Sequence, residues 1–186
     1  LYVSHLTTSG TWSKPENLGP HINSTGNESS PFIHADNQTL FFASDGWPGI
    51  GDMDLYYTRK KPDGTWGDPQ DLGYPINTID HEGSLFVAAD GKTAYFASDR
   101  RDSHGQLDIY RFELYPEARP IQTLYVKGYV YDVKTRQRLS ALIDLIDLDS
   151  RKTISTLTTD RGGNYLVTLP VGKDYAFHVN HEGYLF

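Results

Sequence analysis

Short apolar runs separated by polar turns recur along the first two thirds of the chain. Residues 31–35 form one such run, residues 36–39 a polar turn, and residues 40–43 a second run. Two apolar runs around a turn of this kind predict a β-hairpin. A Gly-rich loop follows, then a third strand over 54–59 and a fourth, outer strand over 66–72. The pattern therefore predicts units of four antiparallel strands.

The whole pattern repeats after 54 residues. Residues 1–54 align without gaps with residues 55–108, and 22 of the 54 positions are identical. A period above forty residues is typical of arrays and propellers, and four antiparallel strands make one blade of a β-propeller. The matched motifs include Gly-Thr-Trp (10–12 and 64–66), Phe-Ala-Ser-Asp (42–45 and 96–99) and Asp-Leu/Ile-Tyr (54–56 and 108–110).

We expect residues 1–115 to be the C-terminal blades of a propeller. Residues 28–73 make one complete blade, residues 1–20 the last two strands of the blade before it, and residues 82–114 a three-stranded blade after it. Closed rings need about 4–8 blades, so the chain is expected to be a piece of something longer. The outer strand missing from 82–114 is expected to come from the propeller's own beginning, upstream of Leu1.

Three stretches of this region resemble PD40-type repeats, which are WD40-like and TolB-related. They are LFFASDGWPGIGDMDLYYT, DGTWGDPQDLGYPINT and AYFASDRRDSHGQLDIYRF. The resemblance covers roughly residues 1–115 and implies a partial β-propeller in an all-β chain.

A second, smaller domain is predicted after a linker. The linker is 116–122, where two prolines discourage regular structure. Residues 123–186 are predicted to form a small antiparallel β-sandwich. Its strands are expected over 126–132, 141–148, 153–159, 164–169 and 175–180.

Residues 123–186 resemble carboxypeptidase regulatory-like domains, which have a transthyretin-like, Ig-like sandwich fold. That family carries no catalytic residues in this domain, and its pattern implies a further strand or strands beyond Phe186. The matching positions are Gly128, Asp132, Thr135, Gly163, Tyr165, Leu169, Gly172, Tyr175, Gly183 and Tyr184.

The two domains in this order resemble the middle of PorE-like, OmpA-family envelope proteins of type IX secretion and gliding systems. The resemblance implies a non-catalytic scaffold that tethers a secretion or motility complex at the outer membrane and peptidoglycan. Its implied partners are other envelope and secretion-system proteins, with peptidoglycan bound through a domain outside these residues. The implied location is the periplasm of a Gram-negative cell, in association with the outer membrane.

The charge and composition of the chain argue against some classes of partner and site. The formal net charge is −7, and residues 1–120 hold 17 acidic against 9 basic side chains. An acidic surface repels phosphate backbones, so no nucleic acid is expected as a partner. No apolar run approaches the ~18 residues of a membrane helix, so no direct membrane span is expected. There is no cysteine, which excludes disulfides and thiolate metal sites.

Two rival functions stay open from sequence: a glycan-binding or sialidase-like, glycan-cleaving propeller, and a propeller that gates a peptidase. Residues 63–66 are similar to part of a sialidase Asp-box turn, but that motif is itself structural. A hydrolase nucleophile needs a base and an orienting acid, and there is no Gly-x-Ser-x-Gly motif. Ser44-Asp45 and Ser98-Asp99 recur at the same strand end, which favours structural roles. We therefore predict no catalytic residue and no cofactor.

The Asp-rich loop of the first repeat is a candidate metal site. Asp45, Asp52 and Asp54 supply carboxylate oxygens of the kind that Ca²⁺ prefers. The counterpart loop has Gln106 in place of Asp52, and aspartates at such positions commonly cap turns. The prediction is that these aspartates are structural and that the chain holds no metal ion.

The loops 46–53 and 100–107 are the best candidates for contact with a partner. They are equivalent in the repeat, so they lie on one face of the ring, and their sequences have diverged where the strands have not. Trp47, Arg100, Arg101 and His104 are the predicted interaction residues, because Trp and Arg are enriched at binding hot spots. The alternative is that loops simply vary and that Trp47 folds back on its own blade.

Overall fold

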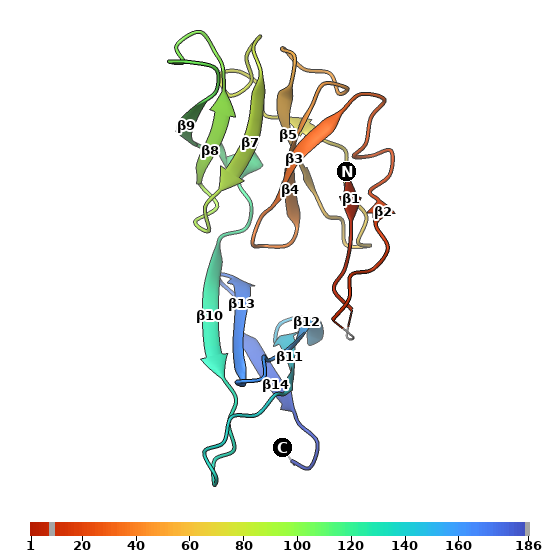
Figure 1. Cartoon of the computed structure of the whole chain (residues 1–186), viewed down its shortest axis with the longest axis vertical. Coiled ribbons are helices and arrows are strands. Elements are labelled where there is room, and N and C mark those ends of the chain that lie inside the picture. Colours follow the sequence, from red (N-terminus) through yellow and green to blue (C-terminus); the bar gives the residue numbers. More distant parts are fainter. Residues whose placement is uncertain (8–9, 185–186) are drawn as a thin grey trace. The chain divides into compact units, whose positions relative to one another are not determined.

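The computed structural model describes residues 1–7 and 10–184 (Figure 1). Its regular elements are β-strands and one short 3₁₀ turn, so the predicted all-β class is confirmed. The chain divides into two compact units, Leu1–Pro120 and Ile121–Phe186. In the described part of the chain, no helix is long and apolar enough to cross a bilayer.

The described residues of the first unit form three antiparallel sheets. Their orders are β1-β2, β3-β4-β5-β6 and β7-β8-β9, so within each sheet consecutive strands are neighbours. The strands are β1 (Tyr2–Val3), β2 (Glu16–Asn17), β3 (Glu28–Ile33), β4 (Thr39–Ser44), β5 (Asp54–Arg59), β6 (Gln70–Asp71), β7 (Glu82–Val87), β8 (Thr93–Ser98) and β9 (Asp108–Glu113).

The two larger sheets repeat the same local geometry 54 residues apart. β3 and β7 each contain a register shift against the next strand, and the residue at the shift, Ser30 or Ser84, has a positive φ of 48° or 53°. The hairpin turns are also alike, because Asp36 and Asp90 each accept two backbone N–H groups and a threonine hydroxyl. The repeated sequence therefore encodes a repeated backbone.

The fourth strand is shorter than predicted. A strand was expected over 66–72, yet only Gln70 and Asp71 pair with β5. Regular pairing stops at Pro69, and the chain next contacts β5 through the N–H of Gly67, which donates to the Arg59 carbonyl at 2.9 Å. The preceding Trp66 makes a single isolated bridge to Lys60.

Each large sheet has two faces, which we name by their residues. Face A carries Leu40, Phe42 and Tyr56 in the first sheet and the equivalents Ala94, Phe96 and Tyr110 in the second. Face B carries Phe41, Ala43, Leu55 and Tyr57 in the first sheet and Tyr95, Ala97, Ile109 and Arg111 in the second. Face B of the first sheet packs against face A of the second in one continuous core.

The core between these sheets is closed by residues that follow the strands. Leu72 and Ile76 come after β6, and Leu114 and Ala118 come after β9. On the other side of the first sheet, face A packs against Ile22, with Leu18, Trp47 and other partly buried side chains around it. The first sheet is therefore covered on both faces.

The second sheet is covered on face A alone. Tyr95 is 37% exposed and Ile109 is 79% exposed, whereas their equivalents Phe41 and Leu55 are 0% and 1% exposed. Among the described residues, β9 pairs only with β8. Residues 115–122 do not extend this sheet, because Pro116–Ala118 forms the 3₁₀ turn and Thr123 begins a strand of the second unit.

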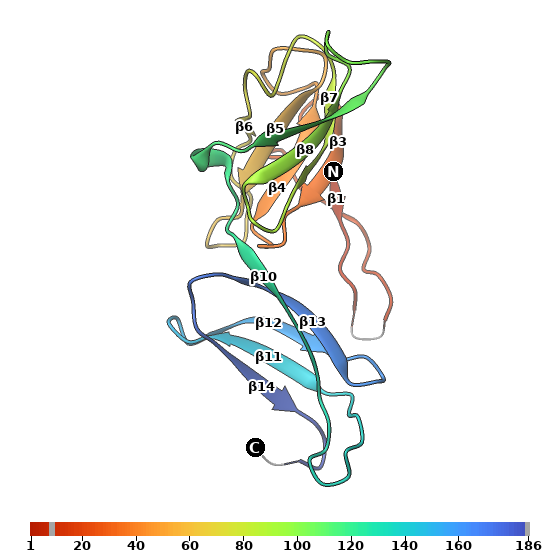
Figure 2. The same cartoon turned by 90° about the vertical axis from the view of Figure 1, so that its left-hand side faces the viewer.

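The second unit is built from a three-stranded sheet, β12-β11-β14, and the pair β10-β13 (Figure 2). Its buried apolar residues include Ile143, Leu145 and Leu169. Gly128 leaves room for the Tyr165 ring, since a Cβ there would lie 2.6 Å from the Tyr165 hydroxyl oxygen and the ring would have to shift. The strands are β10 (Thr123–Tyr129), β11 (Leu142–Asp147), β12 (Lys152–Thr158), β13 (Asn164–Pro170) and β14 (Tyr175–Asn180).

One strand of this unit is displaced from its predicted position. It was expected over 126–132 and lies at Thr123–Tyr129. The strand stops early because Asp132 caps a turn, its Oδ1 accepting the backbone N–H groups of Lys134 and Thr135 at 2.7 and 2.6 Å. An aspartate that satisfies local N–H groups competes with strand pairing.

Equivalent residues on the two sheets give a matched test of this packing. We expect Leu55→Ala to lower the free energy of unfolding of the first unit by about 2–5 kcal/mol, because it leaves a cavity in the core. Ile109→Ala, at the same repeat position on an exposed face, is expected to cost less than ~0.5 kcal/mol. All three tryptophans (12, 47 and 66) lie in the first unit, so their fluorescence during urea unfolding reports it selectively. Equal losses for both variants would contradict the described packing.

A second prediction concerns acid stability of the second unit. Asp147 accepts the Lys173 ammonium at 2.6 Å and the N–H groups of Asp149 and Ser150, and these bonds lower the pKa of its carboxyl to about 2. A carboxyl with a lowered folded pKa contributes stability above its unfolded value, near 4, and loses it as the pH falls through the folded value. We expect NMR signals of β11 amides to weaken between about pH 4 and pH 2. Asp147→Asn should remove this contribution at neutral pH, whereas Asp149→Asn should keep the acid transition.

Candidate functional site

Three connections meet at one end of the first unit, which we call the loop face. They are the β4–β5 loop (45–53), the connection from β6 to β7 (72–81) and the β8–β9 loop (99–107) (Figure 1). Met53 forms a parallel bridge with His81, and its carbonyl accepts the N–H of Glu82 at 2.8 Å. The 72–81 connection therefore lies against the β4–β5 loop, one of the two predicted interaction loops.

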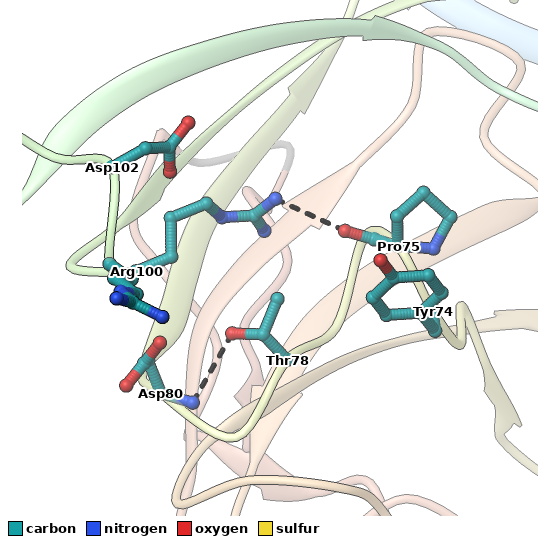
Figure 3. A pocket seen from close by; sticks show the side chains of 7 residues that line it. Tyr74, Pro75, Thr78, Asp80, Arg100 and Asp102 are labelled. Carbon is teal, nitrogen blue, oxygen red and sulfur yellow. Dashed lines mark hydrogen bonds between the residues drawn. The ribbon is translucent and has the colours of Figure 1, made fainter.

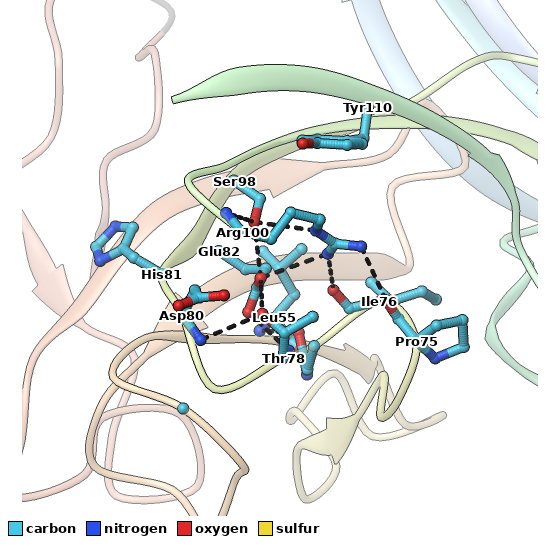
Figure 4. Close-up of polar contacts among 12 residues, drawn as sticks. Leu55, Pro75, Ile76, Thr78, Asp80, His81, Glu82, Ser98, Arg100 and Tyr110 are labelled. Carbon is cyan, nitrogen blue, oxygen red and sulfur yellow. Dashed lines mark hydrogen bonds and ion pairs between the residues drawn. The ribbon is translucent and has the colours of Figure 1, made fainter. Parts of the chain in front are cut away.

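A buried glutamate anchors the loop face of the second sheet. Glu82 is 0% exposed, and its carboxylate accepts the Thr78 N–H at 2.9 Å, the Thr78 hydroxyl at 2.7 Å and the Ser98 hydroxyl at 2.8 Å (Figure 4). Arg100 lies 3.4 Å away and supplies the positive charge. A buried carboxylate is tolerated only when it is hydrogen-bonded and paired in this way.

The first sheet repeats this anchor with one difference. Glu28 accepts the hydroxyls of Ser24 and Ser44, the equivalents of Thr78 and Ser98. It has no arginine beside it, because Gly46 takes the place of Arg100. Glu28 is correspondingly only half-buried. The repeated serines are therefore donors to a structural carboxylate, which agrees with the structural role predicted for them.

The aspartates of the two Ser-Asp pairs also accept structural hydrogen bonds. Asp45 accepts the backbone N–H of Asn27 at 2.6 Å, and Asp99 accepts that of His81 at 2.9 Å. Hydrogen bonds from the Asn27 side chain and backbone hold the pKa of Asp45 below its usual value. Each aspartate thereby ties the start of a sheet to the end of its second strand.

A further pair of equivalent aspartates, Asp54 and Asp108, accepts hydrogen bonds from the backbone of the β4–β5 and β8–β9 loops. Asp54 Oδ2 accepts the N–H groups of Ile50 and Gly51, and Asp108 accepts that of His104, the equivalent of Ile50. The other oxygen of Asp54 is buried without a hydrogen-bond partner, and burial raises the pKa of this carboxyl. In the described residues, no group of three or more His, Cys, Asp or Glu side chains is placed to hold a metal ion.

Trp47 and Arg100 perform the same task in the two repeats. The Trp47 indole donates to the carbonyl of Ile22 at 3.0 Å, and the Arg100 guanidinium donates to the equivalent carbonyl, Ile76, at 2.6 Å. Trp47 is also partly buried against face A of the first sheet. This arrangement matches the alternative in which Trp47 folds back on its own sheet.

Arg100 is held by more than this one bond. Its guanidinium also donates to the Pro75 carbonyl at 3.1 Å, and it lies 4.8 Å from the ring centroids of both Phe96 and Tyr110. Five donors in a planar group allow an arginine to serve several acceptors at once. Both Trp47 and Arg100 are therefore used inside the unit, whatever else they contact.

Arg101 and His104 are exposed at the loop face. Arg101 lines an open pocket of about 510 Å³ together with Tyr74, Asp80 and Asp102 (Figure 3). Of the four predicted interaction residues, the structure brings Arg100 and Arg101 to the rim of this pocket. It leaves Trp47 and His104 in other parts of the loop face.

Sequence reasoning missed two exposed apolar residues on the same connection. Tyr74 is 80% exposed and Ile79 is 77% exposed. Their equivalents in the first repeat are Pro20 and Thr25, so the divergence of the loops extends to this segment. Comparing all non-identical positions between the repeats, and not the β4–β5 and β8–β9 loops alone, would have found them.

A scan against protein-family models found no match, and a search of curated proteins found no similar sequence.

Substitutions at Arg100 and Arg101 can distinguish a residue that stabilises the fold from one that is only exposed at the loop face. We expect Arg100→Ala to cost about 1–3 kcal/mol of unfolding free energy, because it leaves the buried Glu82 carboxylate and the Ile76 carbonyl short of partners. Arg101→Ala, one residue further on, is expected to be neutral within ~0.5 kcal/mol. Tryptophan fluorescence in urea measures both. Equal effects, or a larger effect at Arg101, would rule out the anchoring role of Arg100.

Proposed function

We propose that this chain is part of a non-catalytic cell-envelope scaffold, in which the first unit offers an interaction surface and the second is a rigid connecting module. One observation carries the proposal. Glu28, Ser44 and Asp45 make the same structural hydrogen bonds in the first repeat as Glu82, Ser98 and Asp99 make in the second. At the loop face, by contrast, the exposed residues Arg101, Tyr74 and Ile79 differ from their counterparts Trp47, Pro20 and Thr25.

The arrangement of the sheets supports a propeller of PD40 type. The four-stranded sheet has the strand order of a blade, and it packs face to face on a second sheet with the same register. Stacking of such sheets around an axis is what produces a propeller, with 4–8 blades in a ring. The exposed face B of the second sheet is the surface on which a further blade would pack.

The contacts weaken the sialidase-like alternative. Asp63 accepts the N–H of Thr65 at 2.9 Å and its hydroxyl at 2.6 Å, so the Asp-Gly-Thr-Trp segment is an ordinary capped turn. Arg59 and Arg100 each donate to two backbone carbonyls within the unit. Both arginines therefore make structural contacts within the unit, which favours structural roles for them over ligand binding.

The envelope location and the partners are proposed from the resemblance to PorE-like proteins. The partners are other envelope or secretion-system proteins, and peptidoglycan would be reached through a domain outside these residues. The mechanism is multivalent tethering, in which weak contacts gain strength because they are held together. No catalytic residue, cofactor or metal is part of the proposal.

Site-specific cross-linking tests this function. A photo-reactive amino acid at position 101 or 104 is expected to capture an envelope protein in intact cells of the source organism, in the outer-membrane fraction. The same group at Lys61, in the turn after β5 at the opposite end of the sheet, is the matched control and should not capture that protein. Fractionation of the protein with the cytoplasm, or equal capture from both ends, would contradict the proposal.

A further inference from the structure

The outer face of the β10–β13 pair carries a row of exposed side chains. β10 and β13 lie side by side in antiparallel register (Figure 2), so alternate residues of β10 point to opposite sides of the pair. One side faces the other sheet of this unit, since Tyr165, opposite Gly128, has its ring 5.9 Å from that of Phe177 on β14. The β10 residues on the opposite, outer side are all exposed: Tyr125, Lys127 and Tyr129.

The row continues past the end of β10 into the loop 132–137. Tyr131 follows Tyr129 at a spacing of two residues, and their rings lie 5.6 Å apart. Tyr131 also forms an isolated bridge with Arg138, on the far side of the loop. Tyr125, Tyr129 and Tyr131 are 61%, 54% and 38% exposed. At ~3.3 Å per residue, the row from Tyr125 to Tyr131 is about 20 Å long.

Two exposed arginines lie on the rings of this row. The Arg138 guanidinium carbon is 3.4 Å from the ring centroid of Tyr129, and that of Arg136 is 5.4 Å from the ring centroid of Tyr131. In the described part of the chain, no group accepts a hydrogen bond from the Arg138 guanidinium or forms a salt bridge with it. A guanidinium that lies on a ring keeps its N–H groups available around its edge. Arg138 is therefore a preorganised donor to an anion, unlike Arg100, whose donors are used within the first unit.

The acidic side chains beside the row are already hydrogen-bonded. Asp160 interacts electrostatically with Arg138, but its carboxylate accepts the backbone N–H of Asn164 at 2.8 Å and the Asn164 side-chain amide at 3.0 Å. Asp132 accepts two backbone N–H groups of the loop that it caps and the hydroxyl of Tyr184. These acids therefore do not cancel the three cations of the row, which are Lys127, Arg136 and Arg138.

The shape of this face limits the size of a ligand. An open pocket of about 580 Å³ lies on it, and its lining includes Lys127, Tyr129, Asn164 and Leu166. Leu166, opposite Lys127 on β13, is 64% exposed. Two strands make a strip ~10 Å wide, so its area is about 200 Å², far below the ~800 Å² per partner of a standard protein–protein interface. The strip therefore fits one extended chain and not a folded protein.

A polysaccharide with carboxylates suits this strip better than a peptide or a nucleic acid. The apolar C–H face of a sugar ring packs on a tyrosine ring, and a carboxylate accepts two N–H groups from an arginine. An extended peptide binds instead to the edge of a sheet, where its backbone groups pair. A nucleic-acid strand carries a phosphate at every residue, and residues 1–120, with 17 acidic against 9 basic side chains, repel such a charge density.

We propose that the outer face of β10 and β13 binds a single chain of an acidic polysaccharide. A sugar ring stacks on Tyr125, and sugar carboxylates accept hydrogen bonds from Lys127 and Arg138. Tyr129 is a positioning residue that holds Arg138 in place. This role goes beyond the connecting role proposed for the second unit, and it does not depend on the partner of the first unit. A further strand at either edge of the pair would leave the face open.

An NMR titration of the full 186-residue chain tests the proposal. The probes are hexamers of hyaluronan and of unsulfated chondroitin, which carry a carboxylate on alternate sugars. We expect at least one of them to shift the amide signals of β10 and β13 in a saturable manner. Arg138→Gln is expected to weaken this binding by about tenfold, because a charge-assisted hydrogen bond is lost. Tyr129→Leu should weaken it about fivefold, since Arg138 loses its ring, and Tyr129→Phe should restore it.

Matched controls separate this site from general attraction. Arg151→Gln removes the same charge in the turn before β12, in the other sheet, and should leave binding unchanged. Dispersed amide signals show whether each variant is folded. Maltohexaose, with rings and no charge, and polyglutamate, with carboxylates and no rings, should each bind about tenfold more weakly.

Four outcomes would overturn the proposal. Polyglutamate that binds as tightly as the acidic hexamers would identify a surface for acidic proteins. A dT oligonucleotide that binds as tightly would identify a nucleic-acid surface. The proposal also fails if neither acidic hexamer binds at millimolar concentration, or if folded Arg138→Gln binds as the unaltered protein does.

Discussion

The contact between face B of the first sheet and face A of the second is the interaction on which the first unit depends. Neither sheet has enough strands to bury its apolar residues alone, and each provides the other with a dry surface. Phe41, Leu55 and Phe96 are almost fully removed from water there. Burial of apolar area is the main favourable term in folding, so the polar contacts around this core refine its geometry and do not replace it.

The polar contacts at the loop face satisfy backbone groups that are buried when the two sheets stack. Where the sheets meet at the loop face, the chain must pass from one sheet to the next, and its backbone groups are withdrawn from water. Glu82 with its donors, Asp99 and Arg100 satisfy these groups from side chains. An unsatisfied buried group costs more than a typical hydrogen bond contributes, which explains why Glu82 and Asp99 recur as Glu28 and Asp45, and why Trp47 donates in the first repeat where Arg100 is replaced by Gly46.

Much of this fold follows from the sequence, because the information is local. Short apolar runs around polar turns predict the hairpins of β4 and β8 and the strands β5 and β9 that follow, and the 54-residue period predicts that both sheets share one geometry. The shortness of β6 was not foreseen, because the irregular pairing around Pro69 depends on the partner strand. Burial also could not be predicted. Phe41 and Tyr95 have the same pattern in sequence, and only the packing of whole sheets distinguishes the buried residue from the exposed one. For the same reason, Trp47 and Arg100 look like binding residues until the carbonyls that they cap are seen.

Trp47 and Arg100 donate to equivalent carbonyls, those of Ile22 and Ile76, from different positions of the repeat. This difference limits the substitutions that the first repeat can accept. A Gly46→Arg substitution would not give the first repeat the contacts that Arg100 makes in the second, because a Cβ at Gly46 would lie 1.9 Å from the Ser24 hydroxyl and 2.7 Å from the Gly26 nitrogen. In the second repeat Asp80 stands where Gly26 does, so the two backgrounds differ. The effect of a side chain at this position therefore depends on the residues around it. An arginine that stabilises the second repeat would not fit the first, so the two loops cannot be interchanged one residue at a time.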